Sequence, residues 1–256
     1  MKKRFVVFSL FLFLVFAITS IAHEGETDEY NLDAHSQYPL SSWEAVNYGS
    51  IILILTVLIM MIFQNKLNEP AKKFLFCSLC AVCTLVTLYL IITTLHLNIT
   101  SWSKGPVHWH ADYEIWACDK QLQLVEPTGM SNKQGVLLLH SHDDNRIHVE
   151  GVLTEPRSAS LGAFFHVLGG ELTNYGFTLP TREGVVSVEN GQLCNGLPAT
   201  LSVFVNGVAK ENSPEYVISH YEDVPPGDRI KIIFTEKPIE QINPYIKSEP
   251  KPQEAN

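Results

Sequence analysis

The sequence predicts an α+β protein in which a two-helix membrane anchor precedes a β-rich domain with a single helix. Three observations lead to this prediction. Two long apolar segments lie close together within the first 95 residues, a pattern typical of membrane-spanning helices. Most of residues 106–234 consists of short runs that alternate polar and apolar side chains, as strands do. One segment among them, 160–169, has the apolar spacing of a helix.

The N-terminus has the pattern of a secretory signal peptide. Residues 2–4 are basic, residues 5–18 are almost wholly apolar, and small side chains occupy positions 20 and 22, where a signal peptidase would cleave. We therefore predict a signal peptide over residues 1–22. An uncleaved first transmembrane helix stays open as the alternative, because the apolar run is only a little shorter than a membrane span.

Residues 48–95 hold two apolar segments, 48–63 and 74–95, each near the roughly 20 residues that cross a bilayer. Neither carries the polar stripe of a helix packed in a soluble core. The loop 64–73 between them holds three lysines and one glutamate, and short basic loops stay in the cytoplasm. The segment 23–47 and everything beyond the second span would then lie outside. We predict a multi-pass protein of the cell membrane, with the lipid bilayer as its partner and an extracytoplasmic C-terminal domain.

The charge of the predicted outer parts is strongly acidic. Together they carry 26 acidic residues against 12 lysines and arginines. Such a surface repels phosphates, so a nucleic-acid partner is not expected. The same field would concentrate cations near the domain.

Residues 106–234 are predicted to form one extracytoplasmic domain. Residues 107–117 alternate in polarity, and a turn at Asp119-Lys120 leads into a second short strand, so a hairpin is expected. Ser160 would cap the helix, and a Gly-Gly pair would end it. Further strands are predicted at 136–139, 147–153, 185–188, 201–205 and 229–234, with tight turns at 206–207 and 225–228.

The last strands point to a β-grasp arrangement. Residues 204–207 and 224–232 resemble the closing strands of the small sulfur-carrier proteins. The carriers' C-terminal Gly-Gly is absent, so this resemblance implies fold and not function. The remaining segment, 235–256, holds four prolines and many charges, and we predict a disordered tail there.

Five histidines fall on two short stretches of predicted strand, 108–115 and 139–150. Because side chains alternate between the two faces of a strand, residues two apart share a face. Each stretch therefore presents a His-x-His pair on one side, with carboxylates at matching positions. Imidazole and carboxylate are usual ligands of zinc, copper and iron. The candidate ligands are His108, His110, Asp112, Glu114, His140, His142, His148 and Glu150, with Asp144 as a further partner.

This pattern predicts a transition-metal site, with copper before zinc, because all-nitrogen ligation suits copper in an oxidising, extracytoplasmic setting. Metal capture, sensing or delivery would be the role, with a membrane protein receiving the metal. Two alternatives stay open. One is an outward-facing metalloenzyme, a hydrolase or an oxidase, although no acid, base or nucleophile can be assigned. The other is a non-metal interaction module with histidines that respond to pH.

His23 is a further candidate outside these two stretches. Cleavage after residue 22 would make His23 the N-terminal residue, whose amine and imidazole could chelate copper if His35 approached. The alternative is coincidence in an acidic leader. His166 and His220 are interpreted as structural.

The five cysteines fall into two groups. Cys118 and Cys194 lie in the outer domain, where a disulfide, two free thiols and metal thiolates all stay open. The other three follow a helical spacing inside the second span, where small apolar side chains are favoured over a thiolate site. These three are Cys77, Cys80 and Cys83.

The block 106–234, about half of the chain, resembles a family of extracytoplasmic His-rich domains found in membrane-anchored archaeal and bacterial proteins, most of them uncharacterised. The resemblance rests on His-x-His at 108–110, His-x-His-Asp at 140–143, Ile-His-x-Glu at 147–150 and Leu-Gly-x-Phe-Phe at 161–165. Because the family has no settled activity, the resemblance implies the domain and adds little about its chemistry.

Overall fold

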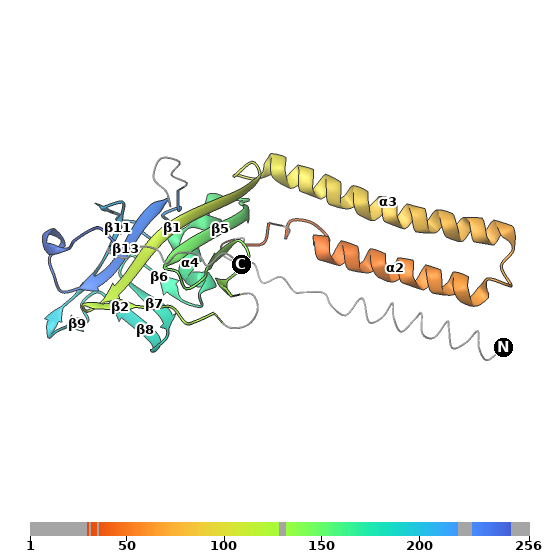
Figure 1. Cartoon of the computed structure of the whole chain (residues 1–256). Coiled ribbons are helices and arrows are strands. Elements are labelled where there is room, and N and C mark those ends of the chain that lie inside the picture. The colour runs from red at the N-terminus through yellow and green to blue at the C-terminus, as the bar shows by residue number, and fades with distance from the viewer. Residues whose placement is uncertain (1–29, 31, 35, 128–131, 220–226, 247–256) are drawn as a thin grey trace.

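The computed structural model describes residues 30, 32–34, 36–127, 132–219 and 227–246, which form two long helices and a β-rich domain (Figure 1). The chain is therefore α+β. The predicted signal peptide, His23, His35 and His220 lie outside the described residues.

The two long helices, α2 (Ser42–Phe63) and α3 (Glu69–Thr100), run antiparallel side by side (Figure 1). Both are long and apolar enough to cross a membrane. In their most apolar windows only 6% of α2 and 0% of α3 is buried. A soluble core helix would be mostly covered by protein, so this exposure fits helices that face lipid.

Capping residues extend both helices beyond the apolar segments. Ser41 caps α2 through a reciprocal pair of bonds, in which its hydroxyl accepts from the Glu44 amide and the Glu44 carboxylate accepts from the Ser41 amide. Asn68 caps α3 by accepting from the Ala71 amide. At 1.5 Å per residue, α3 is about 48 Å long. It is therefore longer than the roughly 30 Å hydrocarbon layer of a bilayer.

The main sheet has eight strands in the order β12-β11-β13-β1-β5-β4-β3, with β2 also paired to β1. β1 is central. It runs parallel to β13 and antiparallel to β5 and β2. The strands are β1 (Pro106–Ala117), β2 (Lys120–Leu122), β3 (Gln134–Gly135), β4 (Leu139–Ser141), β5 (Arg146–Val152), β11 (Thr200–Val205), β12 (Val208–Ala209) and β13 (Asp228–Thr235).

Smaller elements complete the domain. The predicted helix is found as α4 (Leu161–Val167), and the Ser160 hydroxyl caps it by accepting from the Ala163 amide. A three-stranded sheet and a two-stranded sheet follow. Their strands are β6 (Glu171–Leu172), β7 (Gly176–Thr181) and β8 (Gly184–Glu189), then β9 (Leu193–Cys194) and β10 (Leu197–Pro198), and the short helices are η1 (Pro156–Ala159) and η2 (Ile239–Gln241).

The hydrophobic core lies between the main sheet, α4 and β7. The Tyr113 ring of β1 contacts Phe164 of α4 at 5.4 Å, and Phe165 contacts Phe177 of β7 at 5.9 Å. The odd-numbered residues of β1 belong to this core. The even-numbered residues, which include the histidines, therefore occupy the opposite face of the sheet.

The chain after β13 differs from the predicted tail. Residues 236–246 include η2, and the buried Lys231 ammonium donates to the carbonyls of Asn243 and Tyr245 at 2.8 and 3.1 Å. A buried ammonium needs such acceptors, and they hold this segment against the sheet. The domain thus extends beyond residue 234. Residues 247–256 lie outside the described part.

Candidate metal centre

Three histidines from three neighbouring strands stand in one row across the sheet. The register pairs His110 of β1 with His148 of β5, and His148 with His140 of β4. Adjacent strands lie about 4.8 Å apart, so paired side chains touch. The ring centroids of His110 and His148 are 4.7 Å apart, and the rings of His140 and His148 stack in parallel at 5.4 Å.

Two more histidines flank this row. His108 precedes His110 by two residues on the same face, and their Nε2 atoms lie 3.0 Å apart. The ring of His142 lies 4.8 Å from the rings of both His140 and His148. The five rings therefore form one continuous group, which we call the histidine cluster. Its members are His108, His110, His140, His142 and His148.

The histidine cluster contains two sets of three that could hold a metal ion. Within each set, one ligand atom per residue can be chosen so that all lie within 4.8 Å of one another. Two nitrogens bound at 2.0–2.1 Å to a tetrahedral ion would be about 3.3 Å apart, so small side-chain adjustments suffice. The sets are His108, His110 and His148, and His140, His142 and His148.

His140 is the member of the histidine cluster that is buried without any hydrogen bond from its ring to the described residues. Its side chain is 0% exposed, and within the described part of the chain neither ring nitrogen has a hydrogen-bond partner. The same holds for Nδ1 of His148. Because buried polar atoms are almost always paired, such atoms call for a further partner. A metal ion would be a partner for the one lone pair that each neutral ring offers.

In His148 and His142, one ring nitrogen already makes a hydrogen bond within the protein. His148 Nε2 lies 3.1 Å from Asp144 Oδ2, and His142 Nδ1 donates to the Asn132 carbonyl at 2.6 Å. Histidines that bind metals usually give their second nitrogen to a carboxylate or a carbonyl in this way. Nδ1 of His148 and Nε2 of His142 are left as the atoms that would meet an ion.

The electrostatics of the cluster favour neutral imidazole. Loss of contact with water, followed by the charges of His148 and His108, lowers the pKa of His110 from 6.5 to about 4. The pKa of His140 also falls to about 4, through the same loss of water and then the charge of Lys133. Neutral imidazole is the form that ligates a metal.

Asp144 is anionic for a different reason. Burial alone would raise the pKa of this carboxyl group, but hydrogen bonds from His148 and from the Arg146 amide outweigh it and lower the pKa. The site therefore combines the neutral rings of His110 and His140 with a fixed negative charge beside His148.

The structure separates the predicted acidic partners. Glu150 lies opposite His108 in the register, with Oε1 3.2 Å from His108 Nε2. Asp112 instead accepts a bond from Arg146 Nε at 2.8 Å, and Glu114 accepts from Trp116 Nε1 at 2.9 Å. Both side chains lie on the same face of the sheet as the histidines. Each step of two residues along β1, however, places a side chain about 6.6 Å further from His110. Neither belongs to a set of three that could hold an ion.

Cys118 and Cys194 are joined by a disulfide, with their Cα atoms 5.1 Å apart. The bond ties the turn after β1 to β9. It lies at the end of β1 opposite to His108, so these sulfurs are not near the histidine cluster. The cysteines of α3 are free and exposed.

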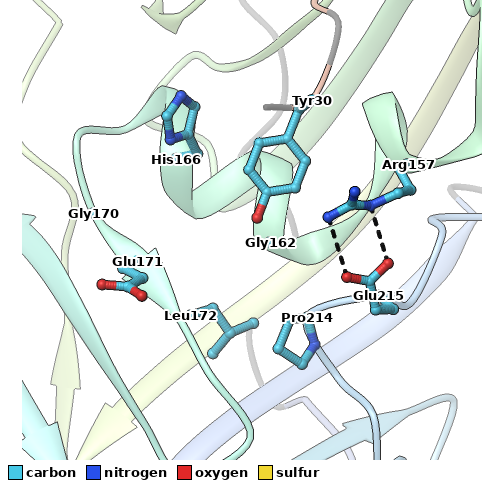
Figure 2. Close-up of a pocket in the computed structure, with 9 residues that line it drawn as sticks. All are labelled: Tyr30, Arg157, Gly162, His166, Gly170, Glu171, Leu172, Pro214 and Glu215. Atoms are coloured by element: carbon cyan, nitrogen blue, oxygen red, sulfur yellow. Dashed lines mark hydrogen bonds and ion pairs between the residues drawn. The ribbon is translucent and has the colours of Figure 1, made fainter. Parts of the chain in front are cut away.

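A separate cavity of about 440 Å³ lies beside α4 (Figure 2). Two of its charged groups are already engaged with each other: Arg157 pairs with Glu215 at 3.2 Å. Arg157 also lies over the Tyr30 ring, which contacts His166. The Tyr30 carbonyl accepts from the Ser158 hydroxyl. Tyr30 thus fixes the segment before α2 to the domain, and we assign this cavity a structural role.

Comparisons of the chain with protein-family models, with curated proteins and with solved structures found no match. What the histidine cluster binds is therefore inferred from its own geometry.

Proposed function

We propose that the domain binds a transition-metal ion through the histidine cluster. The observation that supports this most strongly is the burial of His140 with both ring nitrogens unpartnered in the described part of the chain. An imidazole placed this way for structural reasons alone would lose hydrogen bonds to water and gain none. A bound ion removes that penalty at one nitrogen.

Copper is the first choice of metal, and zinc the second. The two sets of three contain only imidazole nitrogen, which suits both ions. Copper binds such sites more tightly than zinc in the general order of divalent metals. An oxidising location outside the membrane also fits copper, and the disulfide agrees with that location.

The role that we propose is metal capture, sensing or delivery at the outer face of a cell membrane. The lysines near the turn between α2 and α3 support a cytoplasmic position for that turn, with the domain on the other side. The cluster is close to the end of α3, because Ser103 bonds to Leu153 just where β1 and β5 begin to pair (Figure 1). A membrane protein beside the anchor could receive the ion there.

Two finer assignments belong to the same proposal. The parallel pairing of β1 with β13 supports a β-grasp-like arrangement of the sheet. The motifs at 108–110, 140–143 and 147–150 all contribute to the cluster, which supports a shared site in the family that the domain resembles.

An outward-facing metalloenzyme is the second candidate. One observation favours it: the side chain of His108 is 64% exposed, so an ion held by His108, His110 and His148 would have a position open to water.

Elemental analysis tests the main proposal. The full-length protein in detergent micelles is given equal Cu²⁺ and Zn²⁺ and is then desalted. We expect stoichiometric metal, with copper in excess, and loss of it in the double variant His140→Gln/His148→Gln. His166→Gln, on α4, is the control that keeps wild-type content. Unchanged metal in the double variant would refute the site, whereas an excess of zinc would change only the choice of metal.

A further inference from the structure

We propose that the histidine cluster holds one ion at a time in two alternative positions that share His148. The outer position, formed with His108 and His110, receives the ion from solvent. The inner position, formed with His140 and His142, retains it. This inference rests on the proposed metal binding and adds a stoichiometry and a direction to it.

The sharing follows from the bonding of His148. Both sets of three that could hold an ion include this residue. Its Nε2 is engaged by Asp144 at 3.1 Å, so Nδ1 is the nitrogen left to bind metal. One imidazole nitrogen has one lone pair in the ring plane and can bind one ion. The two positions therefore cannot both be complete at once.

The outer position is open to solvent. The side chain of His108 is 64% exposed, and that of its partner Glu150 is 41% exposed. The Nε2 atoms of His108 and His110 already lie 3.0 Å apart, close to the spacing of two ligands on one ion. The Glu150 carboxylate adds negative charge that attracts a cation. An ion arriving from solvent meets these groups first.

The inner position is the more buried of the two, with only His142 partly exposed. His140 and His148 are 0% and 1% exposed. The Asn132 carbonyl fixes the ring of His142 from the side of the segment that precedes β3. An ion there also binds the lone pair of His140, whose ring nitrogens otherwise lack a partner in the described part of the chain. The inner position is thus the better bound and the slower to exchange.

Transfer between the positions needs no departure from the cluster. The rings of His110 and His142 lie 4.7 and 4.8 Å from that of His148. The bonds from the ion to His108 and His110 break while those to His140 and His142 form, and the bond to His148 Nδ1 persists. The ion keeps its charge, and no electron or proton is exchanged.

The test uses Co²⁺, whose visible absorption reports its coordination, and the full-length protein in detergent micelles. We expect saturation at one Co²⁺ per chain. His108→Gln should load about tenfold more slowly and release to a chelator at the wild-type rate. His140→Gln should load at the wild-type rate and release about tenfold faster. His148→Gln should lose both positions, and His166→Gln should match the wild type.

Several results would overturn the two-position arrangement while leaving metal binding intact. These are two Co²⁺ bound per wild-type chain, a full equivalent retained by His148→Gln, or equal effects of His108→Gln and His140→Gln on both rates. No Co²⁺ bound by the wild type would refute the proposed function together with this inference. The test by Co²⁺ stoichiometry uses the wild-type protein alone and so does not depend on the folding of any variant. If His140→Gln fails to fold, His140→Asn replaces it.

Discussion

Asp144 Oδ2 lies 3.1 Å from Nε2 of His148, four residues further along the chain. The contact fixes the ring of the one histidine that belongs to both sets of candidate ligands. It leaves Nδ1, which has no partner in the described part of the chain, as the nitrogen for an ion and strengthens it as a ligand.

Removing this carboxylate should weaken metal binding without removing any ligand. We expect Asp144→Asn to lower the affinity for Zn²⁺ by about 10–100-fold, the usual effect of losing such a partner. Competition with a zinc-binding dye measures the affinity. Asp143→Asn is the matched control, because Asp143 pairs with Arg182 instead. Equal affinities of Asp144→Asn and the wild type would contradict the orienting role.

The metal-free domain should lose stability as the pH falls from about 6.5 to about 4. In this window the unfolded chain protonates His110 and His140, whose pKa values are near 4 in the folded protein. The unfolded state then binds more protons, so acid favours unfolding. Thermal unfolding with a chelator present, followed by circular dichroism at several pH values, measures the slope.

The double variant His110→Gln/His140→Gln should flatten this pH dependence, because its side chains do not titrate. A slope as steep as that of the wild type would mean that other groups cause the acid sensitivity.

The disulfide should stabilise the domain without affecting the metal site. Replacing Cys118 and Cys194 by Ala should lower the free energy of unfolding by about 2–4 kcal/mol. The bond lies at the far end of β1 from His108, so metal stoichiometry should not change. Denaturant titration and elemental analysis measure the two effects. Loss of metal in the double variant would show that the sulfurs support the site.

The orientation in the membrane can be tested at the turn between the long helices. With Cys77, Cys80 and Cys83 replaced by Ser, the variant Gln64→Cys should react with a membrane-impermeant maleimide only after the membrane is opened. A cysteine at Glu211, an exposed residue of the domain, should react in intact cells. The reverse pattern would place the histidine cluster in the cytoplasm.

The sequence predicts those features of the fold that depend on neighbours along the chain. Alternation along β1 separates His108 and His110 from the core side chain Tyr113, as the structure has them. The helix predicted at 160–169 is found as α4, because Ser160 and the apolar spacing act locally. β7 is not predicted, because Gly176 and Pro180 ordinarily interrupt strands.

The structure adds what depends on strand pairing. No local pattern indicates that β5 lies between β1 and β4, and this order is what aligns His110, His148 and His140. The burial of His140 also depends on tertiary packing. The same face of β1 carries Asp112, but Arg146, which pairs with it, comes from β5. A shared face therefore predicts that residues are near a site, and register decides which of them reach it.

No pattern in the sequence predicts that a backbone carbonyl would orient one of the cluster histidines. The Asn132 carbonyl holds His142, and any residue type could supply a carbonyl. The positive φ of 45° at Asn132 is a conformation that Asn adopts more readily than most residues.

The most direct test of the central claim is X-ray absorption at the metal edge of the full-length protein loaded with one equivalent of Zn²⁺. If either set of three imidazoles holds the ion, the spectrum should show at least three nitrogen neighbours at about 2.0–2.1 Å with the scattering pattern of imidazole rings. A shell of oxygen atoms without imidazole scattering, or zinc that is lost on desalting, would contradict the account.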